Sequence, residues 1–102
     1  MNLEFYSEEK LKKQLSRIIF TYLDKNKWSA FLFGSRVKGN NSPSSDIDVG
    51  IEGTESVPLE IMFKIREEIE EIPTLYSFDI VDFNAVSEDF KKKAKKEAEY
   101  VG

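Results

Sequence analysis

Apolar residues near the start of the chain recur at intervals of three and four, which is the spacing of one face of an α-helix. This stripe consists of Leu11, Leu15, Ile18, Ile19, Tyr22 and Leu23. Ser7 lies just before it and suits the N-cap position, while Glu8 and Glu9 lie where the helix dipole favours negative charge. The pattern predicts a helix over about 7–24.

Three later segments have the pattern of strands. They are the aromatic-rich run 28–33 (WSAFLF), the alternating run 46–52 (DIDVGIE) and the apolar run 77–83 (SFDIVDF). Side chains two apart on a strand point to the same face. In the second strand, Asp46 and Asp48 therefore share one face, and Ile47, Val49 and Ile51 share the other.

Two more helices are predicted in the second half of the chain. Pro58 suits a first helical turn, and Pro73 stops the apolar stripe of Leu59, Met62, Ile65, Ile69 and Ile72. Ser87 suits the cap of a last helix over about 88–100. This helix contains the basic run 91–96 (KKKAKK), which is expected to be a solvated face.

The order of these elements predicts the fold class. A strand–helix–strand unit over 46–83 favours a parallel pair of strands. The loop over 34–45 is long enough to permit an antiparallel first pair. We therefore expect an α/β (α+β) fold, a small mixed sheet flanked by helices, as a single domain over residues 1–102.

Composition excludes several kinds of chemistry. The chain has 102 residues and a net charge of −4, which argues against a direct nucleic-acid binder. It contains no Cys and no His, so thiolate sites, His-ligated metals and Ser-His hydrolase chemistry are excluded. No apolar segment resembles a signal peptide or a membrane span, so a cytoplasmic protein is expected.

The segment that carries chemistry lies between the first two strands. Gly34 allows the backbone to approach a ligand, and Ser35 offers a hydroxyl and backbone N–H groups to a phosphate. Arg36 either contacts phosphates or is solvated. Asp46 and Asp48 can share a Mg²⁺ ion, which binds one or two carboxylates together with phosphate oxygens. A third carboxylate from a neighbouring strand would complete a two-metal site.

The third carboxylate has two candidates on the last strand. Asp79 and Asp82 are three residues apart and so point to opposite faces. Asp82 lies near the end of the strand, where a carboxylate can reach solvent or cap a turn without a metal. Asp79 lies inside an apolar run, where a buried charge is costly unless it is paired or metal-bound. We predict that Asp79 joins Asp46 and Asp48.

At these residues the sequence resembles the nucleotidyltransferase superfamily of the DNA polymerase β type. The family signature is Gly-Ser, a spaced Asp-x-Asp and a third Asp, which match 34–39 (GSRVKG), 45–48 (SDID) and 78–82 (FDIVD). The chain is similar in particular to the minimal nucleotidyltransferases (MNT) of prokaryotes. The resemblance implies a nucleotidyltransferase fold and an enzyme in which a hydroxyl attacks the α-phosphate of a nucleoside triphosphate.

The resemblance also implies roles for individual residues. Catalytic and metal-binding roles fall on Asp46, Asp48 and Asp79, with two Mg²⁺ ions as cofactors. The expected nucleotide-binding residues are Gly34, Ser35 and Arg36, with ATP as the substrate.

The same resemblance implies a partner. Minimal members are commonly paired with a small helical HEPN toxin, and several transfer AMP to a Tyr of that toxin. We expect an antitoxin that modifies a protein hydroxyl and forms a homo- or hetero-oligomer, with Tyr76, Phe83 and Phe90 as candidate contacts. One alternative is a non-catalytic nucleotide-binding protein that neutralises its toxin by occlusion. A transferase of the aminoglycoside or tRNA type would need further domains to bind its acceptor.

Overall fold

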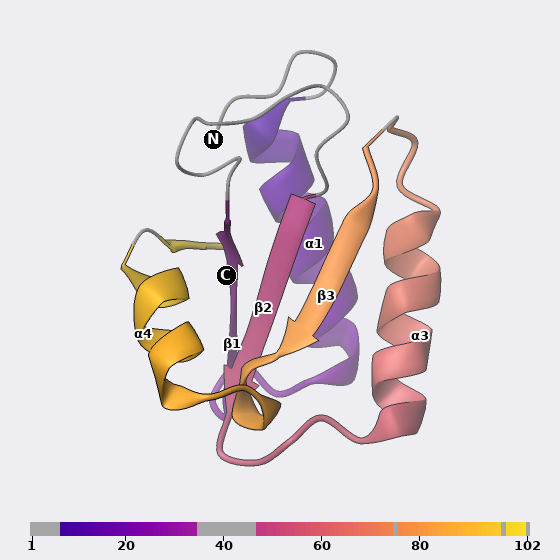
Figure 1. The fold of residues 1–102 in the computed structure, drawn as a ribbon. Coiled ribbons are helices and arrows are strands. Elements are labelled where there is room, and N and C mark those ends of the chain that lie inside the picture. Colours follow the sequence, from indigo (N-terminus) through magenta and orange to yellow (C-terminus); the bar gives the residue numbers. More distant parts are fainter. Residues whose placement is uncertain (1–6, 35–46, 75, 97, 102) are drawn as a thin grey trace.

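Within the described residues, four strands form one mixed sheet in the order β3-β2-β1-β4 (Figure 1). The computed structural model describes residues 7–34, 47–74, 76–96 and 98–101. The elements, in chain order, are α1 (Glu8–Tyr22), β1 (Trp28–Phe33), β2 (Ile47–Gly53), α3 (Leu59–Glu70), β3 (Phe78–Asp82), the short 3₁₀ helix η1 (Phe83–Ala85), α4 (Glu88–Lys95) and β4 (Glu99–Tyr100).

The strand pairing agrees with the sequence pattern. β1 and β2 are antiparallel, with Phe33 opposite Asp48, whereas β2 and β3 are parallel, with Asp48 beside Asp79. The loop between β1 and β2 is expected to contain a helical turn near Ser35, but residues 35–46 lie outside the described part of the chain. The expected α/β class with a small mixed sheet is confirmed.

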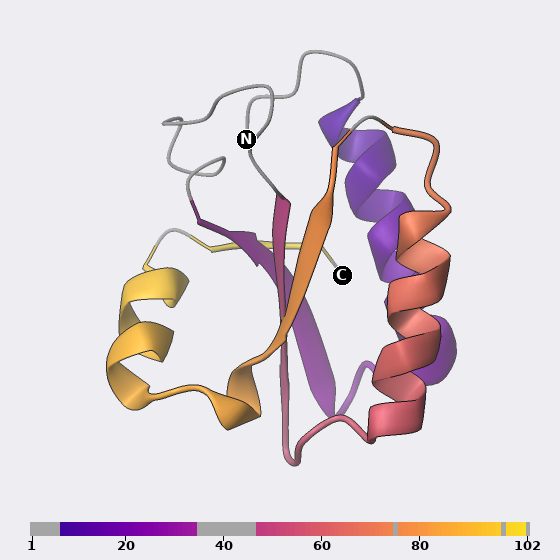
Figure 2. The same ribbon diagram turned by 45° about the vertical axis from the view of Figure 1, so that its right-hand side comes forward.

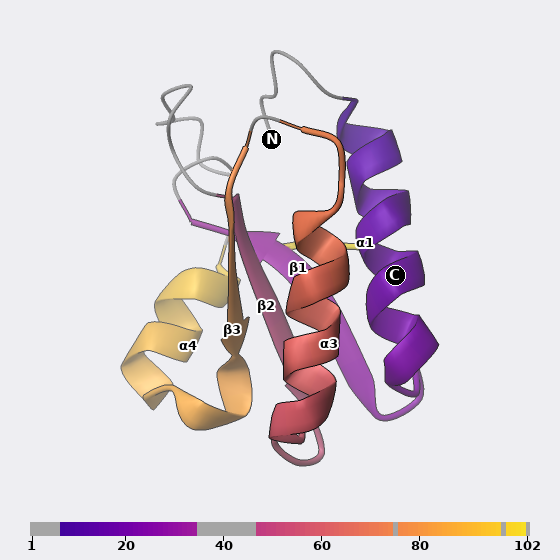
Figure 3. The same cartoon turned by 90° about the vertical axis from the view of Figure 1, so that its right-hand side faces the viewer.

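The sheet separates two unequal layers of helices. Figures 2 and 3 show α1 and α3 covering one face and α4 covering the other. The larger apolar core lies under α1 and α3 and includes Leu15, Ile51 and Ile65, which are fully buried. A smaller aromatic core lies on the α4 face and consists of Phe31, Phe33 and Phe83. None of the described helices is long and apolar enough to cross a membrane.

The helix ends follow the capping residues in the sequence. Ser7 caps α1, and its Oγ accepts a hydrogen bond of 3.3 Å from the Lys10 N–H. Ser87 caps α4 in the same way, through the Phe90 N–H at 3.2 Å. Pro58 is the N-cap of α3 and not part of its first turn. The two serine caps satisfy backbone donors that a helix cannot satisfy internally, whereas Pro58 makes no side-chain capping hydrogen bond.

Some apolar residues lie where the sequence pattern does not place them. Leu59 is expected on the buried side of α3 but is 87% exposed, and the buried residue at this end of the helix is Val57. Tyr76 and Phe83 are expected to contact a partner but are buried in the fold. The third candidate partner contact, Phe90, is 42% exposed.

The last predicted helix is shorter than expected. α4 ends at Lys95 rather than near residue 100, and Glu99–Tyr100 form β4 against β1. Lys12 of α1 contacts this strand through the Glu99 carboxylate, with Nζ and Oε1 2.9 Å apart. The hydrogen bond from Lys12 holds the pKa of the Glu99 carboxyl well below its ordinary value.

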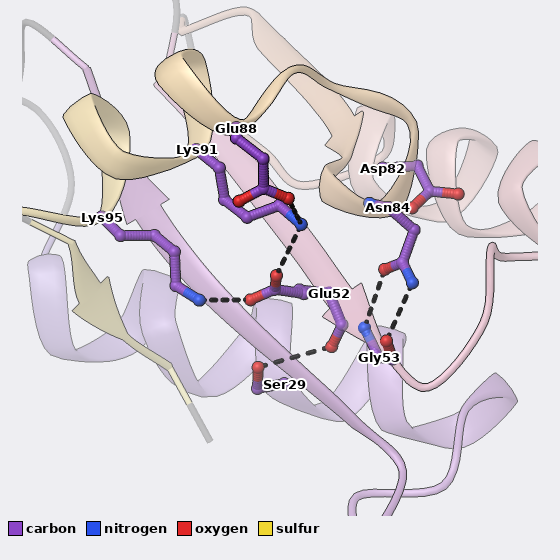
Figure 4. A network of polar contacts seen from close by, with 8 residues as sticks. All are labelled: Ser29, Glu52, Gly53, Asp82, Asn84, Glu88, Lys91 and Lys95. Carbon is purple, nitrogen blue, oxygen red and sulfur yellow. Dashed lines mark hydrogen bonds and ion pairs between the residues drawn. The ribbon is translucent and has the colours of Figure 1, made fainter.

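Ion pairs attach α4 to the C-terminal end of β2. The Glu52 carboxylate lies 2.5 Å from the Lys95 Nζ and 3.4 Å from the Lys91 Nζ (Figure 4). The hydrogen bond from Lys95 lowers the pKa of the Glu52 carboxyl. The basic run is largely solvent-exposed, as expected, and these two lysines also bind the sheet.

Candidate active site

Two of the predicted site acids lie side by side at one end of the sheet. Asp48 is at the start of β2 and Asp79 at the start of β3, and the parallel register makes them direct neighbours. Alternation places both on the α4 face of the sheet, because the flanking Ile47, Val49 and Ile80 are buried on the opposite face. Two carboxylates from different strands are thus brought to one place.

Gly34 follows β1 at the same end of the sheet. Its φ angle is +88°, a conformation that side chains other than hydrogen strongly disfavour. A Cβ atom at this position would lie 2.1 Å from the Asp48 Oδ2. The positive φ angle therefore favours glycine, and a side chain at this position would displace the Asp48 carboxylate.

The two acids of β3 have different surroundings. Asp79 is exposed, so the expectation of a buried charge is wrong, and it faces the same side as Asp48. Asp82 binds backbone groups: its Oδ2 accepts from the Val57 N–H and its Oδ1 from the Asn84 N–H, each at 2.9 Å. The predicted capping role of Asp82 is confirmed.

A cavity of about 410 Å³ adjoins the two acids. Its described lining residues come from β1, β2, β3 and α4 and are Phe33, Gly34, Asp48, Asp79, Val81, Phe90, Lys93 and Ala94. The part of the lining that the structure describes has an acidic side, an aromatic and aliphatic wall, and one lysine. Its volume is in the range of small-molecule sites.

The contribution of α4 to this cavity was not apparent from the sequence. Phe90, Lys93 and Ala94 are spaced i, i+3 and i+4, so they share one face of the helix. The signal that could have found them is this spacing within the predicted last helix. The spacing alone does not single out Lys93, because every residue of the run 91–96 except Ala94 is a lysine.

The residues present suit a hard divalent cation. Asp48 and Asp79 supply carboxylate oxygens, which Mg²⁺ prefers, and a cation of this size binds one or two carboxylates together with phosphate oxygens. The described residues contain no group of three acids able to hold a metal. The third predicted ligand, Asp46, lies outside the described residues, as do Ser35 and Arg36.

Comparison with known proteins agrees with this geometry. Residues 13–101 match the family described as polymerase beta, nucleotidyltransferase. The chain belongs to this family. A relative of this nucleotidyltransferase is the Probable protein adenylyltransferase MntA of Haemophilus influenzae, 30% identical over 69 residues. That match covers 68% of the present chain but only 60% of the length of MntA.

Solved structures show the same nucleotidyltransferase fold. A toxin–antitoxin crystal structure with AMP-PNP superimposes with a TM-score of 0.71 at 18% identity, and covers 94% of this chain and 73% of the other. A complex of the tri-AMPylated Shewanella oneidensis HEPN toxin with its MNT antitoxin also gives 0.71, at 12% identity, covering 94% and 72%. At these identities the likeness concerns the fold.

Proposed function

We propose that this chain is a nucleotidyltransferase that transfers AMP from ATP to a hydroxyl group of a partner protein. The hydroxyl oxygen forms a bond to the α-phosphorus, the bond from that phosphorus to the pyrophosphate group breaks, and the hydroxyl proton is released. The observation that carries the proposal is the adjacent pair Asp48 and Asp79 on the wall of a cavity of about 410 Å³.

The side chains of the cavity suit the parts of a nucleotide. Asp48 and Asp79, with Asp46, would hold Mg²⁺, and the bound ion would neutralise phosphate charge and favour loss of the hydroxyl proton. Gly34 allows the Asp48 carboxylate to lie against the backbone that follows β1. Ser35 and Arg36 are proposed to bind phosphate oxygens. Phe33 and Phe90 offer aromatic surface to the nucleoside.

A protein acceptor suits the exposure of the site. Asp79 is exposed, and Phe90, which also lines the cavity, is 42% exposed, so a side chain of another protein can reach the cavity. The relative MntA is named a protein adenylyltransferase, and the solved neighbours include a complex of an AMPylated HEPN toxin with an MNT antitoxin. These comparisons support a HEPN toxin as the acceptor and an antitoxin role for the present chain.

Calorimetry of ATP binding tests the nucleotide site. We expect ATP to bind in the presence of Mg²⁺ and to bind much more weakly when EDTA replaces the metal. Asp48→Asn and Asp79→Asn should each weaken the Mg²⁺-dependent binding, whereas Glu70→Gln, an exposed acid on α3, should not. Equal binding of ATP with and without Mg²⁺ would contradict the metal site.

A toxicity assay separates catalysis from occlusion. If the chain acts by AMP transfer, the Asp79→Asn variant should fail to neutralise the partner toxin in cells, although it still forms the complex. Full neutralisation by this variant would favour the alternative of a non-catalytic binding protein.

A further inference from the structure

The basic run of α4 divides between two faces of the helix. Lys91 and Lys95 are four residues apart and both pair with Glu52. Lys93 lies between them in sequence but lines the cavity, on the face that also carries Phe90 and Ala94. The run is therefore not one surface, and Lys93 belongs to the candidate active site.

We propose that Lys93 is a nucleotide-binding residue whose ammonium group contacts the phosphate chain of the nucleoside triphosphate. This inference rests on the proposed function and adds a binding residue to the same site. Family resemblance and motif spacing point to residues 34–48 and Asp79, and neither points to α4.

The charge balance of the cavity supports this role. Among its described lining residues, Asp48 and Asp79 are negative and Lys93 alone is positive. A triphosphate carries several negative charges, so the Lys93 ammonium group would add to the positive charge that the proposed Mg²⁺ supplies beside the two carboxylates. A lysine on a flexible stem provides a mobile positive charge with three hydrogen-bond donors.

The ammonium group of Lys93 is available for a ligand. Lys91 and Lys95 are engaged with Glu52, whereas Lys93 forms no ion pair with the described residues.

The helix that carries Lys93 is held against the sheet at several points. Figure 4 shows Glu52 between Lys91 and Lys95, and the Asn84 side chain bonded to the backbone of Gly53. The Asn84 amide donates to the Gly53 carbonyl at 2.8 Å and its oxygen accepts from the Gly53 N–H at 3.0 Å. These contacts hold the segment before α4, and the face of α4 that packs on the sheet, in place. The position of Lys93 beside the cavity is therefore fixed by the fold.

Replacement of Lys93 by alanine tests the contact, with Lys92→Ala as the matched control. Lys92 is the neighbouring exposed lysine and is not among the described lining residues of the cavity. Its replacement by alanine removes the same charge from the same helix. We expect Lys93→Ala to raise the Kd for Mg²⁺-ATP about tenfold, as for the loss of one charge-assisted hydrogen bond. Lys92→Ala should change it less than about twofold, and Lys93→Arg should retain most of the affinity.

Inorganic tripolyphosphate identifies the part of the ligand that Lys93 contacts. Competition of tripolyphosphate against labelled ATP should weaken in Lys93→Ala by about the same factor as ATP binding itself. Equal Kd values for Lys93→Ala and Lys92→Ala would overturn the proposal. A loss of ATP affinity without a loss of tripolyphosphate affinity would also overturn it, because the contact would then be with the nucleoside. If the unaltered chain fails to bind ATP, the proposed function itself fails.

Discussion

Asp79 is expected to contribute to metal binding but not to the stability of the fold. It is exposed on β3 and faces Asp48, so an amide in its place leaves the packing intact. We expect Asp79→Asn to reduce the rate of AMP transfer at least about a hundredfold. Loss of a residue that only hydrogen-bonds to a metal ligand typically reduces activity about 10- to 100-fold, and loss of the ligand itself should reduce it more. The melting temperature should stay the same. Transfer of label from α-labelled ATP measures the first, and thermal denaturation the second.

Asp82 provides the contrast on the same strand. Its carboxylate accepts from two backbone N–H groups, at Val57 and Asn84, and an amide can accept only one of these bonds. Asp82→Asn should lower the free energy of unfolding by about 1–3 kcal/mol while the folded protein keeps its activity. Urea denaturation measures the first. An inactive Asp82→Asn beside an active Asp79→Asn would show that the two faces of β3 are wrongly assigned.

Gly34 is expected to tolerate no side chain. A methyl group there would both strain a backbone with φ of +88° and lie 2.1 Å from the Asp48 Oδ2. We expect Gly34→Ala to lose about 1–2 kcal/mol of stability and to bind Mg²⁺-ATP at least about tenfold more weakly. Calorimetry checks the binding. Unchanged affinity would mean that neither Gly34 nor the position of Asp48 matters for the ligand.

The faces on which some of the site residues lie could be predicted from the sequence. The alternation of residues 46–52 places Asp48 on the polar face, and the three-residue spacing separates Asp79 from Asp82. The exposure of Asp79 could not be predicted, because it depends on β3 lying at the edge of the described sheet. Lys93 could not be distinguished from its neighbours, because its role depends on which face of α4 meets the sheet.

At the level of elements, the attachment of α4 should depend on pH. The folded pKa of Glu52 is lowered from its ordinary 4.5, chiefly by the hydrogen bond from Lys95. A lowered carboxyl pKa stabilises the fold above the unfolded value, and this stabilisation is lost as the pH falls through the folded pKa. The pKa of Lys95 is raised from 10.5, chiefly by Glu52, so its contribution is complete below that value and is lost as the pH rises through the folded pKa.

Glu52→Gln tests this pH dependence. Between about pH 5 and 10 the variant should be less stable by about 1 kcal/mol, the magnitude of a partly exposed ion pair. The difference should disappear in acid, below the lowered pKa of Glu52. Melting curves at several pH values measure it. A stability difference that persists at the most acidic pH would mean that Glu52 acts through packing and not through its charge.

The elements themselves differ in how far the sequence determines them. α1 and the first three strands have apolar patterns long enough to define a period, and the structure places them within about two residues of expectation. β4 has two residues, Glu99 and Tyr100, which cannot show a period, and it forms because β1 offers a free edge. Leu59, in the first turn of α3, is exposed, whereas Met62 and Ile65, one and two turns later, are buried in the core.

At the scale of the whole molecule, the sheet separates the stabilising core from the candidate site. The larger core lies under α1 and α3, while the cavity lies on the α4 face. Ile65 is fully buried in that core, so Ile65→Ala should cost about 2–5 kcal/mol of stability. At a temperature where the variant remains folded, its Kd for Mg²⁺-ATP should equal that of the unaltered chain. A folded variant with weakened ATP binding would show that core and site are coupled.

Asp48 and Asp79 are proposed to form the site of AMP transfer to a partner protein. Intact-mass spectrometry of the partner toxin, after incubation with this chain, ATP and Mg²⁺, tests this proposal most directly. We expect the toxin to gain the mass of one or more AMP groups with the unaltered chain and with Glu70→Gln, and to gain none with Asp48→Asn or Asp79→Asn. A toxin that is neutralised by the unaltered chain while its mass stays unchanged would contradict AMP transfer at this site.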